Sequence, residues 1–301
     1  MIEILQNSSR RKLSFTNDRS KYYHSFIKWA GGKSRLIQQI QYFLPDHFNN
    51  YFEPFVGSGA LFFYLVKMGK ISKDKLAQLS DINLELINTY RTIKYSLSEL
   101  INQLQQNEKE YSKDPQKFYY NLRNENFEFN NIKKAARFIT LNKTCYNGLY
   151  RVNKKGFFNV PFGRYNNPKI CDIYSLTKVN EILNSTNTII ENYDYQSILT
   201  KVQEDDFIYI DPPYHPLNDT SHFTNYTTFG FDIHQQKRLA IFFNELDKRK
   251  CKIILSNSDT IFIRDLYSPF KENIVSLKAL RSINCNSKKR KNHYEIIIKN
   301  F

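Results

Sequence analysis

The stretch Phe207-Ile208-Tyr209-Ile210-Asp211-Pro212-Pro213-Tyr214 decides the fold of this 301-residue chain. Its first four residues are apolar and predict a short strand of a parallel sheet that is covered on both faces. The two prolines end the strand, because they cannot donate to a ladder and they fix an extended turn. We therefore expect an open α/β sheet with Asp211 and Tyr214 at its carboxyl edge, where such sheets bind ligands.

This turn joins three groups with complementary chemistry: the Asp211 carboxylate, the Pro212 carbonyl and the Tyr214 ring. The two oxygen acceptors can take two hydrogen bonds from an exocyclic amino group while the ring stacks on the base that carries it. An isolated Asp-Pro-Pro would be an ordinary turn after a strand. The function therefore depends on what accompanies it along the chain.

Composition points to a polyanionic partner. The chain has 44 Lys and Arg against 29 Asp and Glu, a formal net charge of +15, which favours nucleic acid. Aromatic residues make up 15% of the chain, so some rings can stack on bases while most pack in the core.

Cysteine usage and hydropathy indicate an intracellular protein. The four cysteines are scattered, without Cys-x-x-Cys spacing or a neighbouring histidine cluster, so we expect reduced thiols, no disulfide and no metal site. No apolar run approaches the length of a membrane span, and the polar, basic N-terminus lacks a signal-peptide pattern. We expect a soluble, cytoplasmic protein with no membrane partner.

A second motif resembles the turn that carries a nucleotide-like cofactor. Residues 51–63 read as strand, glycine turn and helix, with Glu53 before the turn and Gly57 and Gly59 within it. The glycine spacing is too short for the dinucleotide fingerprint, which disfavours NAD. Asp81 ends a second strand about twenty residues later, where α/β folds place an acid on ribose hydroxyls. Together the two elements favour a ribose-bearing cofactor.

The N-terminal part combines a polar extension with another glycine turn. Residues 1–24 read as a basic extension, and Gly31-Gly32-Lys33 precedes a helical pattern whose first amides could attract negative charge. The glycine pair alone is weak evidence, because it lacks the full spacing of a P-loop.

The chain divides into two interleaved parts. A cofactor-binding domain takes residues 25–97 and 175–301, with later strands expected at 188–195, 252–258 and 294–298 and a helix at 233–249. The polar, helical residues 98–174 form an inserted domain, whose segment 145–165 reads as a β-hairpin rich in basic and aromatic residues. Such a hairpin can enter a DNA groove, although a solvated hairpin explains the same pattern.

Five motifs in this order resemble Dam-type DNA adenine N6-methyltransferases, over residues 25 to the C-terminus. They are Lys28-Trp29-Ala30-Gly31-Gly32-Lys33, Glu53-Pro54-Phe55-Val56-Gly57-Ser58-Gly59, Cys145-Tyr146-Asn147-Gly148-Leu149 through Gly163-Arg164-Tyr165, Asp211-Pro212-Pro213-Tyr214, and Arg281-Ser282-Ile283-Asn284. The resemblance implies a seven-stranded Rossmann-like methyltransferase sheet with an inserted target-recognition domain, and S-adenosyl-L-methionine (AdoMet) as methyl donor. Double-stranded DNA is the implied substrate and GATC the expected site.

The resemblance also assigns roles to residues. Asp211, Pro212 and Tyr214 are the implied catalytic residues. Residues implied in cofactor binding are Trp29, Lys33, Glu53, Phe55, Gly57, Gly59, Asp81 and Asp211. Residues implied in DNA binding are Lys28, Tyr146, Asn147, Leu149, Arg151, Pro161 and Arg164.

The chemistry of the residues agrees with this reading. An adenine buried in a duplex must be flipped out before its N6 can react. Asp211 and the Pro212 carbonyl would accept the N6 hydrogens, Tyr214 would stack on the ring, and the methyl group would pass in line without a covalent enzyme intermediate.

Other readings stay open. One keeps the fold and cofactor with another planar nitrogen as acceptor, in cytosine, RNA or a protein amide. Another is a catalytically inactive DNA-binding module. We expect a monomer whose restriction endonuclease, if it has one, is a genetic and not a physical partner.

Overall fold

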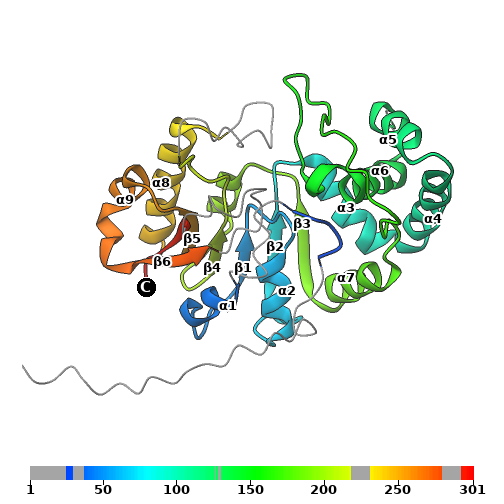
Figure 1. Cartoon of the computed structure of the whole chain (residues 1–301). Helices are drawn as coiled ribbons and strands as arrows, with labels where there is room; N and C mark the ends of the chain where they lie inside the picture. Colours follow the sequence, from blue (N-terminus) through cyan, green and yellow to red (C-terminus); the bar gives the residue numbers. More distant parts are fainter. Residues whose placement is uncertain (1–24, 30–36, 126, 128–129, 218–230, 280–292) are drawn as a thin grey trace, which may run out of the picture.

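Seven strands form one sheet in the order β3-β2-β1-β4-β5-β7-β6 (Figure 1). The computed structural model describes residues 25–29, 37–125, 127, 130–217, 231–279 and 293–301. Strands β1 to β5 run parallel, and β7 pairs antiparallel with both β5 and β6. The strands are β1 Tyr51–Glu53, β2 Leu76–Ser80, β3 Asn187–Glu191, β4 Phe207–Ile210, β5 Lys252–Ser258, β6 Ile274–Ala279 and β7 His293–Lys299.

Most helices lie towards the two ends of this sheet, and α1 and α2 lie near β1 and β2 (Figure 1). Figure 1 shows α3 to α7 gathered beyond the β3 edge, and α8 and α9 near β5 and β6. The helices are α1 Ile37–Ile40, α2 Ala60–Lys67, α3 Leu84–Tyr95, α4 Leu97–Lys113, α5 Pro115–Asn124, α6 Asn131–Thr144, α7 Ile173–Ser185, α8 Ile233–Lys248 and α9 Ile261–Leu266. No helix in the described ranges is long and apolar enough to cross a membrane.

The burial of strand β4 on both faces of the sheet explains why its sequence is continuously apolar. Phe207 and Tyr209 belong to the buried cluster on one face of the sheet, and Ile208 and Ile210 belong to the cluster on the other face. Alternate side chains of a strand point to opposite faces, so a strand covered on both sides has no polar position. The predicted Rossmann-like α/β sheet is confirmed.

The sheet reverses its order between β1 and β4. From β1 the chain winds to β2 and β3, and it then crosses back to β4 on the other side of β1. Ligands of open α/β sheets lie outside the carboxyl ends of the strands at such a reversal. Glu53 at the end of β1 and Asp211 after β4 therefore meet at the expected binding edge.

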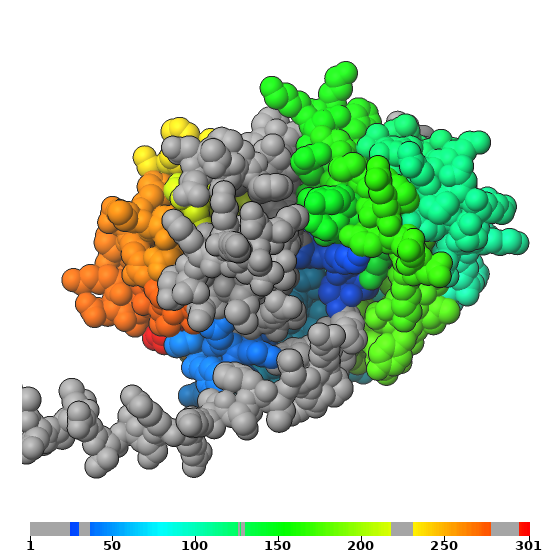
Figure 2. Space-filling view, in the orientation of Figure 1, coloured from blue at the N-terminus to red at the C-terminus, as the bar shows by residue number. Residues whose placement is uncertain are grey.

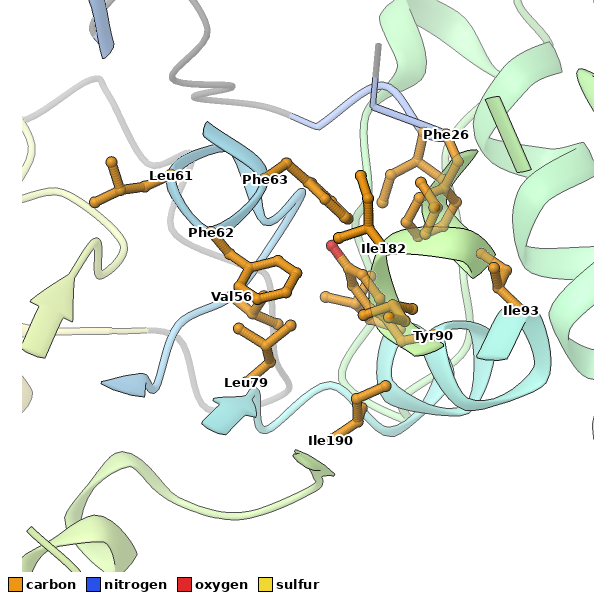
Figure 3. Close-up of a cluster of buried hydrophobic side chains, with 14 of the residues drawn as sticks. Phe26, Val56, Leu61, Phe62, Phe63, Leu79, Tyr90, Ile93, Ile182 and Ile190 are labelled. Carbon is orange, nitrogen blue, oxygen red and sulfur yellow. The ribbon is translucent and has the colours of Figure 1, made fainter. Parts of the chain in front are cut away.

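The core continues across the expected domain boundary at residue 97. Tyr90 and Ile93 of α3 share one buried cluster with Leu100 and Leu104 of α4, and Figure 3 shows part of it, where Phe62, Leu79 and Tyr90 face one another. Residues on both sides of the boundary thus exclude water together. The division at 97 and 174 stays a prediction.

Two local expectations need correction, and one strand was missed. The expected strand at 188–195 ends at Glu191, because Asp194 accepts a hydrogen bond from the backbone N of Gln196 and starts a 3-10 helix. The segment 145–165 is less regular than a β-hairpin: its antiparallel pairing consists of two isolated bridges, Cys145 with Phe162 and Val152 with Phe158. Strand β6 was not predicted at all.

Candidate active site

Asp211 lies directly after β4, and its carboxylate is oriented by the neighbouring strand. Ser256 of β5 donates a hydrogen bond from Oγ to Asp211 Oδ1 over 2.7 Å. Ser256 is fully buried and Asp211 is half-buried. A charge-assisted hydrogen bond of this length holds one carboxylate oxygen in place.

The rest of the motif is held on both sides. The Tyr214 hydroxyl donates to Glu295 Oε2 of β7 over 3.1 Å, and burial, together with Asp211 and Glu295, raises the pKa of Tyr214 well above its ordinary value. The phenol therefore stays neutral near pH 7. The Pro213 carbonyl accepts a hydrogen bond from Gln236, whereas no described residue donates to the Pro212 carbonyl.

A second carboxylate lies buried at the end of β1. Glu53 accepts a hydrogen bond of 2.9 Å from the hydroxyl of Tyr51. Burial raises the pKa of Glu53 to about 8, the Tyr51 hydrogen bond opposes this rise, and the nearby Asp211 and Asp81 carboxylates add to it. Glu53 is thus destabilised as an anion and suits a cationic or hydroxyl-bearing ligand.

Asp81 binds the glycine turn after β1. Its carboxylate accepts hydrogen bonds from the backbone N of Gly57, at 3.3 Å, and of Asn83, at 2.9 Å. Burial raises the pKa of Asp81 to about 6, against the lowering effect of these backbone donors. The glycine turn after β1 and the acid after β2 therefore lie in direct contact.

The turn itself needs glycine at two positions. Gly57 has φ +45° and Gly59 has φ +65°, in the left-handed region that other residues rarely adopt. A Cβ on Gly57 would meet Nε1 of Trp29 at 2.7 Å, and a Cβ on Gly59 would meet the hydroxyl of Tyr90 at 2.8 Å. The Trp29 ring therefore lies directly against the turn.

Aromatic residues surround this turn on two sides. Trp29 stacks on Tyr150, with ring centroids 5.7 Å apart, and the Tyr150 hydroxyl donates to Glu85 over 2.9 Å. On the other side, Phe55 stacks on Tyr195 with centroids 5.2 Å apart. Lys33 and the residues 281–284 lie outside the described residues.

All the expected DNA-contacting residues except Lys28 belong to the segment 145–165. It projects from the body beside α6 (Figures 1 and 2) and rests on a small buried cluster that contains Tyr119, Phe158 and Val160. Its turn is closed by a hydrogen bond from the backbone N of Asn153 to the Phe157 carbonyl over 2.9 Å. The segment is therefore anchored at its base.

The exposed residues of this segment differ in how they are held. Tyr146, Asn147, Pro161 and Arg164 are exposed, and Asn147 and Arg164 have positive φ of 54° and 56°. Arg151 is exposed but already donates from Nε to Asn159 Oδ1 over 2.7 Å.

Two further residues in the DNA-binding set take part in packing. Leu149 is half-buried and packs against the cluster below the segment. Lys28 lies with its ammonium 4.1 Å from the centre of the Tyr165 ring, and its backbone N and O are both bound by the Asn142 amide, over 2.8 and 2.6 Å.

Comparison with known proteins settles the family. The family model of the "D12 class N6 adenine-specific DNA methyltransferase" matches residues 29–283. The chain belongs to this family. It is 44% identical to the type II methyltransferase M.MjaIII of Methanocaldococcus jannaschii, over 92% of this chain and 98% of the relative. It is 33% identical to the DNA adenine methylase of Escherichia coli K12, over 92% and 95%.

Membership of a D12 methyltransferase family implies AdoMet as methyl donor, and the site has features that fit it. AdoMet carries a sulfonium cation and a ribose, and the edge formed by β1, β2 and β4 holds three acids, Glu53, Asp81 and Asp211, beside a glycine turn. Two of these acids have raised pKa values because they are buried, so a cation beside them would be stabilised. Within the described ranges, no group of His, Cys, Asp and Glu is arranged to hold a metal ion.

Sequence reasoning missed the residues that orient Asp211 and Tyr214. Ser256 and Glu295 lie on strands that were predicted, but neither was assigned a role. The signal for Ser256 was available, since Ser256-Asn257-Ser258 places polar residues at the carboxyl end of an apolar strand, next to the strand that ends at Asp211. Glu295 carried no such signal.

Proposed function

We propose that this chain transfers a methyl group from AdoMet to N6 of an adenine that is flipped out of duplex DNA, in the sequence GATC. The observation that carries the proposal is the pair of oriented side chains after β4: Asp211 held by Ser256 and Tyr214 held by Glu295. In a D12 methyltransferase, a fixed carboxylate beside a fixed ring suits the amino group of a stacked base.

The residues around the glycine turn would hold the cofactor. Asp81, which already binds the backbone of the turn, lies where α/β folds bind ribose hydroxyls. Gly57 and Gly59 would form the wall of the site, because their left-handed backbone lets Trp29 and Tyr90 pack against the turn. Trp29 and Phe55 would border the cofactor, and Glu53, Lys33 and Asp211 complete the set. Bound AdoMet supplies an electrophilic methyl group on a sulfonium.

The catalytic residues act on the adenine amino group. Asp211 would accept a hydrogen bond from one hydrogen of the N6 amino group, and the Pro212 carbonyl would accept a hydrogen bond from the other. The Pro213 carbonyl is occupied by Gln236, which favours the Pro212 carbonyl for this role. These two hydrogen bonds localise the nitrogen lone pair towards the methyl group of AdoMet. Holding the nucleophile in near-attack geometry contributes most of the rate acceleration. Tyr214 stacks on the flipped ring.

The inserted residues 98–174 would recognise the target. Basic and aromatic residues of the segment 145–165, with Lys28 beside them, would lie in or against the groove and on phosphates. Arg164, exposed at the end of the segment, is the best placed to read a guanine edge. Two relatives named type II methyltransferases, at 44% and 40% identity, support a restriction endonuclease as genetic partner.

The test is transfer of labelled methyl from AdoMet to a duplex with one GATC site, beside a duplex in which that site is scrambled. We expect label only in the first, on N6 of adenine, and none with Asp211→Ala, which should still bind DNA. Label in both duplexes would reject GATC as the target. An active Asp211→Ala would reject the catalytic assignment, and no label in either duplex would favour another acceptor or a binding module.

A further inference from the structure

Two side-chain amides are fully buried behind the Asp211 motif. Gln236 belongs to the first turns of α8 and Asn257 to the end of β5, and neither is exposed to solvent. Buried amides destabilise a fold unless they are hydrogen-bonded. Both are bonded here, and one end of their hydrogen-bond chain is a carbonyl of the motif.

The chain of hydrogen bonds runs in one direction only. The backbone N of His215 donates to Asn257 Oδ1 over 3.0 Å, and that of Ser258 donates to the same oxygen over 2.8 Å. Asn257 Nδ2 donates to Gln236 Oε1 over 3.0 Å, and Gln236 Nε2 donates to the Pro213 carbonyl over 3.0 Å.

The backbone groups at its ends determine this direction. A peptide N–H can only donate and a carbonyl can only accept. The Asn257 oxygen must therefore face His215, and the Gln236 nitrogen must face Pro213. Neither amide can turn over without placing two donors or two acceptors together.

The two tethered groups flank Tyr214. The Pro213 carbonyl belongs to the peptide before Tyr214, and the His215 N–H belongs to the peptide after it. The Tyr214 hydroxyl is held separately by Glu295. The ring thus has both neighbouring peptides and its outer end fixed, which leaves little freedom for its plane.

We propose that Gln236 and Asn257 are positioning residues, whose hydrogen-bond chain fixes the plane of the Tyr214 ring for stacking on the target base. The inference rests on the proposed function. Its structural alternative is that the two amides only join α8 to β5, in which case their loss would lower stability and leave turnover per folded molecule unchanged.

Near-isosteric acids separate the two accounts. In Gln236→Glu the ionised carboxylate cannot donate to the Pro213 carbonyl, so the chain breaks at that end. In Asn257→Asp both acceptor bonds remain, but the donor to Gln236 is lost, and Gln236 must turn its oxygen towards Pro213. Both variants and the wild type are assayed at alkaline pH, because burial keeps such an acid protonated near neutral pH, when it could still donate. Gln235→Glu is the matched control, because it adds the same charge in the same turn, where the N-terminus of α8 favours it.

We expect kcat of both variants to fall by roughly ten- to a hundredfold, which is the scale for a misplaced reacting group. The Kd for AdoMet and the Kd for DNA should each change less than about twofold, because neither amide belongs to the proposed AdoMet-binding or DNA-binding residues. Gln235→Glu should behave as wild type. Asn257→Asp keeps two of its bonds and carries the test if Gln236→Glu does not fold.

Amide hydrogen exchange of residues 211–217, followed by mass spectrometry, gives a second readout without catalysis. Faster exchange there, with the rest of the protein unchanged, would support the proposal. Wild-type kcat in either folded variant, or unchanged exchange, would overturn it. A wild-type protein that methylates no adenine rejects the proposed function instead.

Discussion

Ser256 and Asp211 are 45 residues apart, and the hydroxyl of the first lies 2.7 Å from the carboxylate of the second. The contact exists because β5 pairs in parallel with β4, with Ile210 beside Leu255, so that both strands end at the same edge. The serine on β5 thus orients the carboxylate that follows β4.

Removing this hydroxyl should slow methyl transfer and leave binding intact. Ser256→Ala loses one hydrogen bond to a carboxylate, which contributes about 1–3 kcal/mol. We expect kcat to fall by roughly ten- to a hundredfold, with Kd for AdoMet and DNA unchanged, in single-turnover methylation and calorimetry.

Ser258→Ala is the matched control on the same strand. Ser258 is buried, but its hydroxyl has no hydrogen-bond partner among the described residues. Its loss should leave kcat at the wild-type value. Equal rates for Ser256→Ala and wild type would show that Asp211 does not depend on the serine.

Gly57 should be indispensable for cofactor binding. Gly57→Ala places a methyl group 2.7 Å from the Trp29 indole and holds alanine at φ +45°. We expect Kd for AdoMet to rise at least about tenfold, about 1.4 kcal/mol, because the new methyl group would displace the Trp29 indole beside the proposed cofactor site. The left-handed backbone itself should cost about 1–2 kcal/mol of stability. Trp29 is the single tryptophan of the chain, so its fluorescence in an AdoMet titration reports both binding and its own displacement.

Gly69→Ala separates backbone strain from the contact. Gly69 has φ +68°, yet a Cβ there meets nothing within 4 Å. This variant should lose a similar amount of stability and keep both the wild-type emission and the wild-type Kd. The same loss of AdoMet binding in both variants would attribute the Gly57 effect to general destabilisation.

Glu53 should make the free protein less stable as the pH rises. Burial raises the pKa of this carboxyl to about 8, whereas an exposed glutamate has a pKa of about 4.3. The contribution of the neutral carboxyl to the free energy of unfolding is therefore complete below about pH 4.3 and is lost as the pH rises through about 8. The slope reaches at most about 1.4 kcal/mol per pH unit. Glu53→Gln should remove it, so that the difference in Tm between variant and wild type grows from pH 5 to pH 9. A constant difference would place the Glu53 pKa near its ordinary value.

The strands that the sequence predicts well are those with a local signal. β4 and β5 are covered on both faces, so their apolar runs are continuous, and Asp81 could be placed because parallel strands share one carboxyl edge. β6 carries no such run: Ile274 and Val275 are only half-buried, Ser276 is exposed, and the strand pairs with β7, which follows much later in the chain.

The contacts that orient the site depend on sheet order, which local patterns do not encode. Glu295 reaches Tyr214 because β7 inserts antiparallel beside β5 instead of following β6 at the edge. The hydrogen bond from the Arg151 guanidinium to Asn159 within the segment is a further contact that local patterns do not encode, and the DNA contact that the resemblance implies for Arg151 stays a prediction.

Arg164 and Lys155 should contribute to DNA binding in different ways. Both are exposed on the segment 145–165. Arg164 follows Gly163, whose backbone N donates a hydrogen bond to the Thr144 carbonyl at the end of α6. Lys155 lies in the turn at the tip of the segment. An arginine fixed near its backbone can make a bidentate bond to guanine, and a flexible lysine contacts phosphate. Arg164→Ala should therefore lower the preference for the GATC duplex over the scrambled duplex by about 1–3 kcal/mol.

Lys155→Ala is the counterpart, since it should weaken binding to both duplexes equally. It should also reduce the slope of log K against log salt by about one. Binding titrations with both duplexes at several salt concentrations measure the two effects together. The opposite result would be a changed preference for the GATC duplex in Lys155→Ala and a changed slope of log K against log salt alone in Arg164→Ala. In that case the tip of the segment would recognise the bases, and Arg164 would contact the DNA backbone.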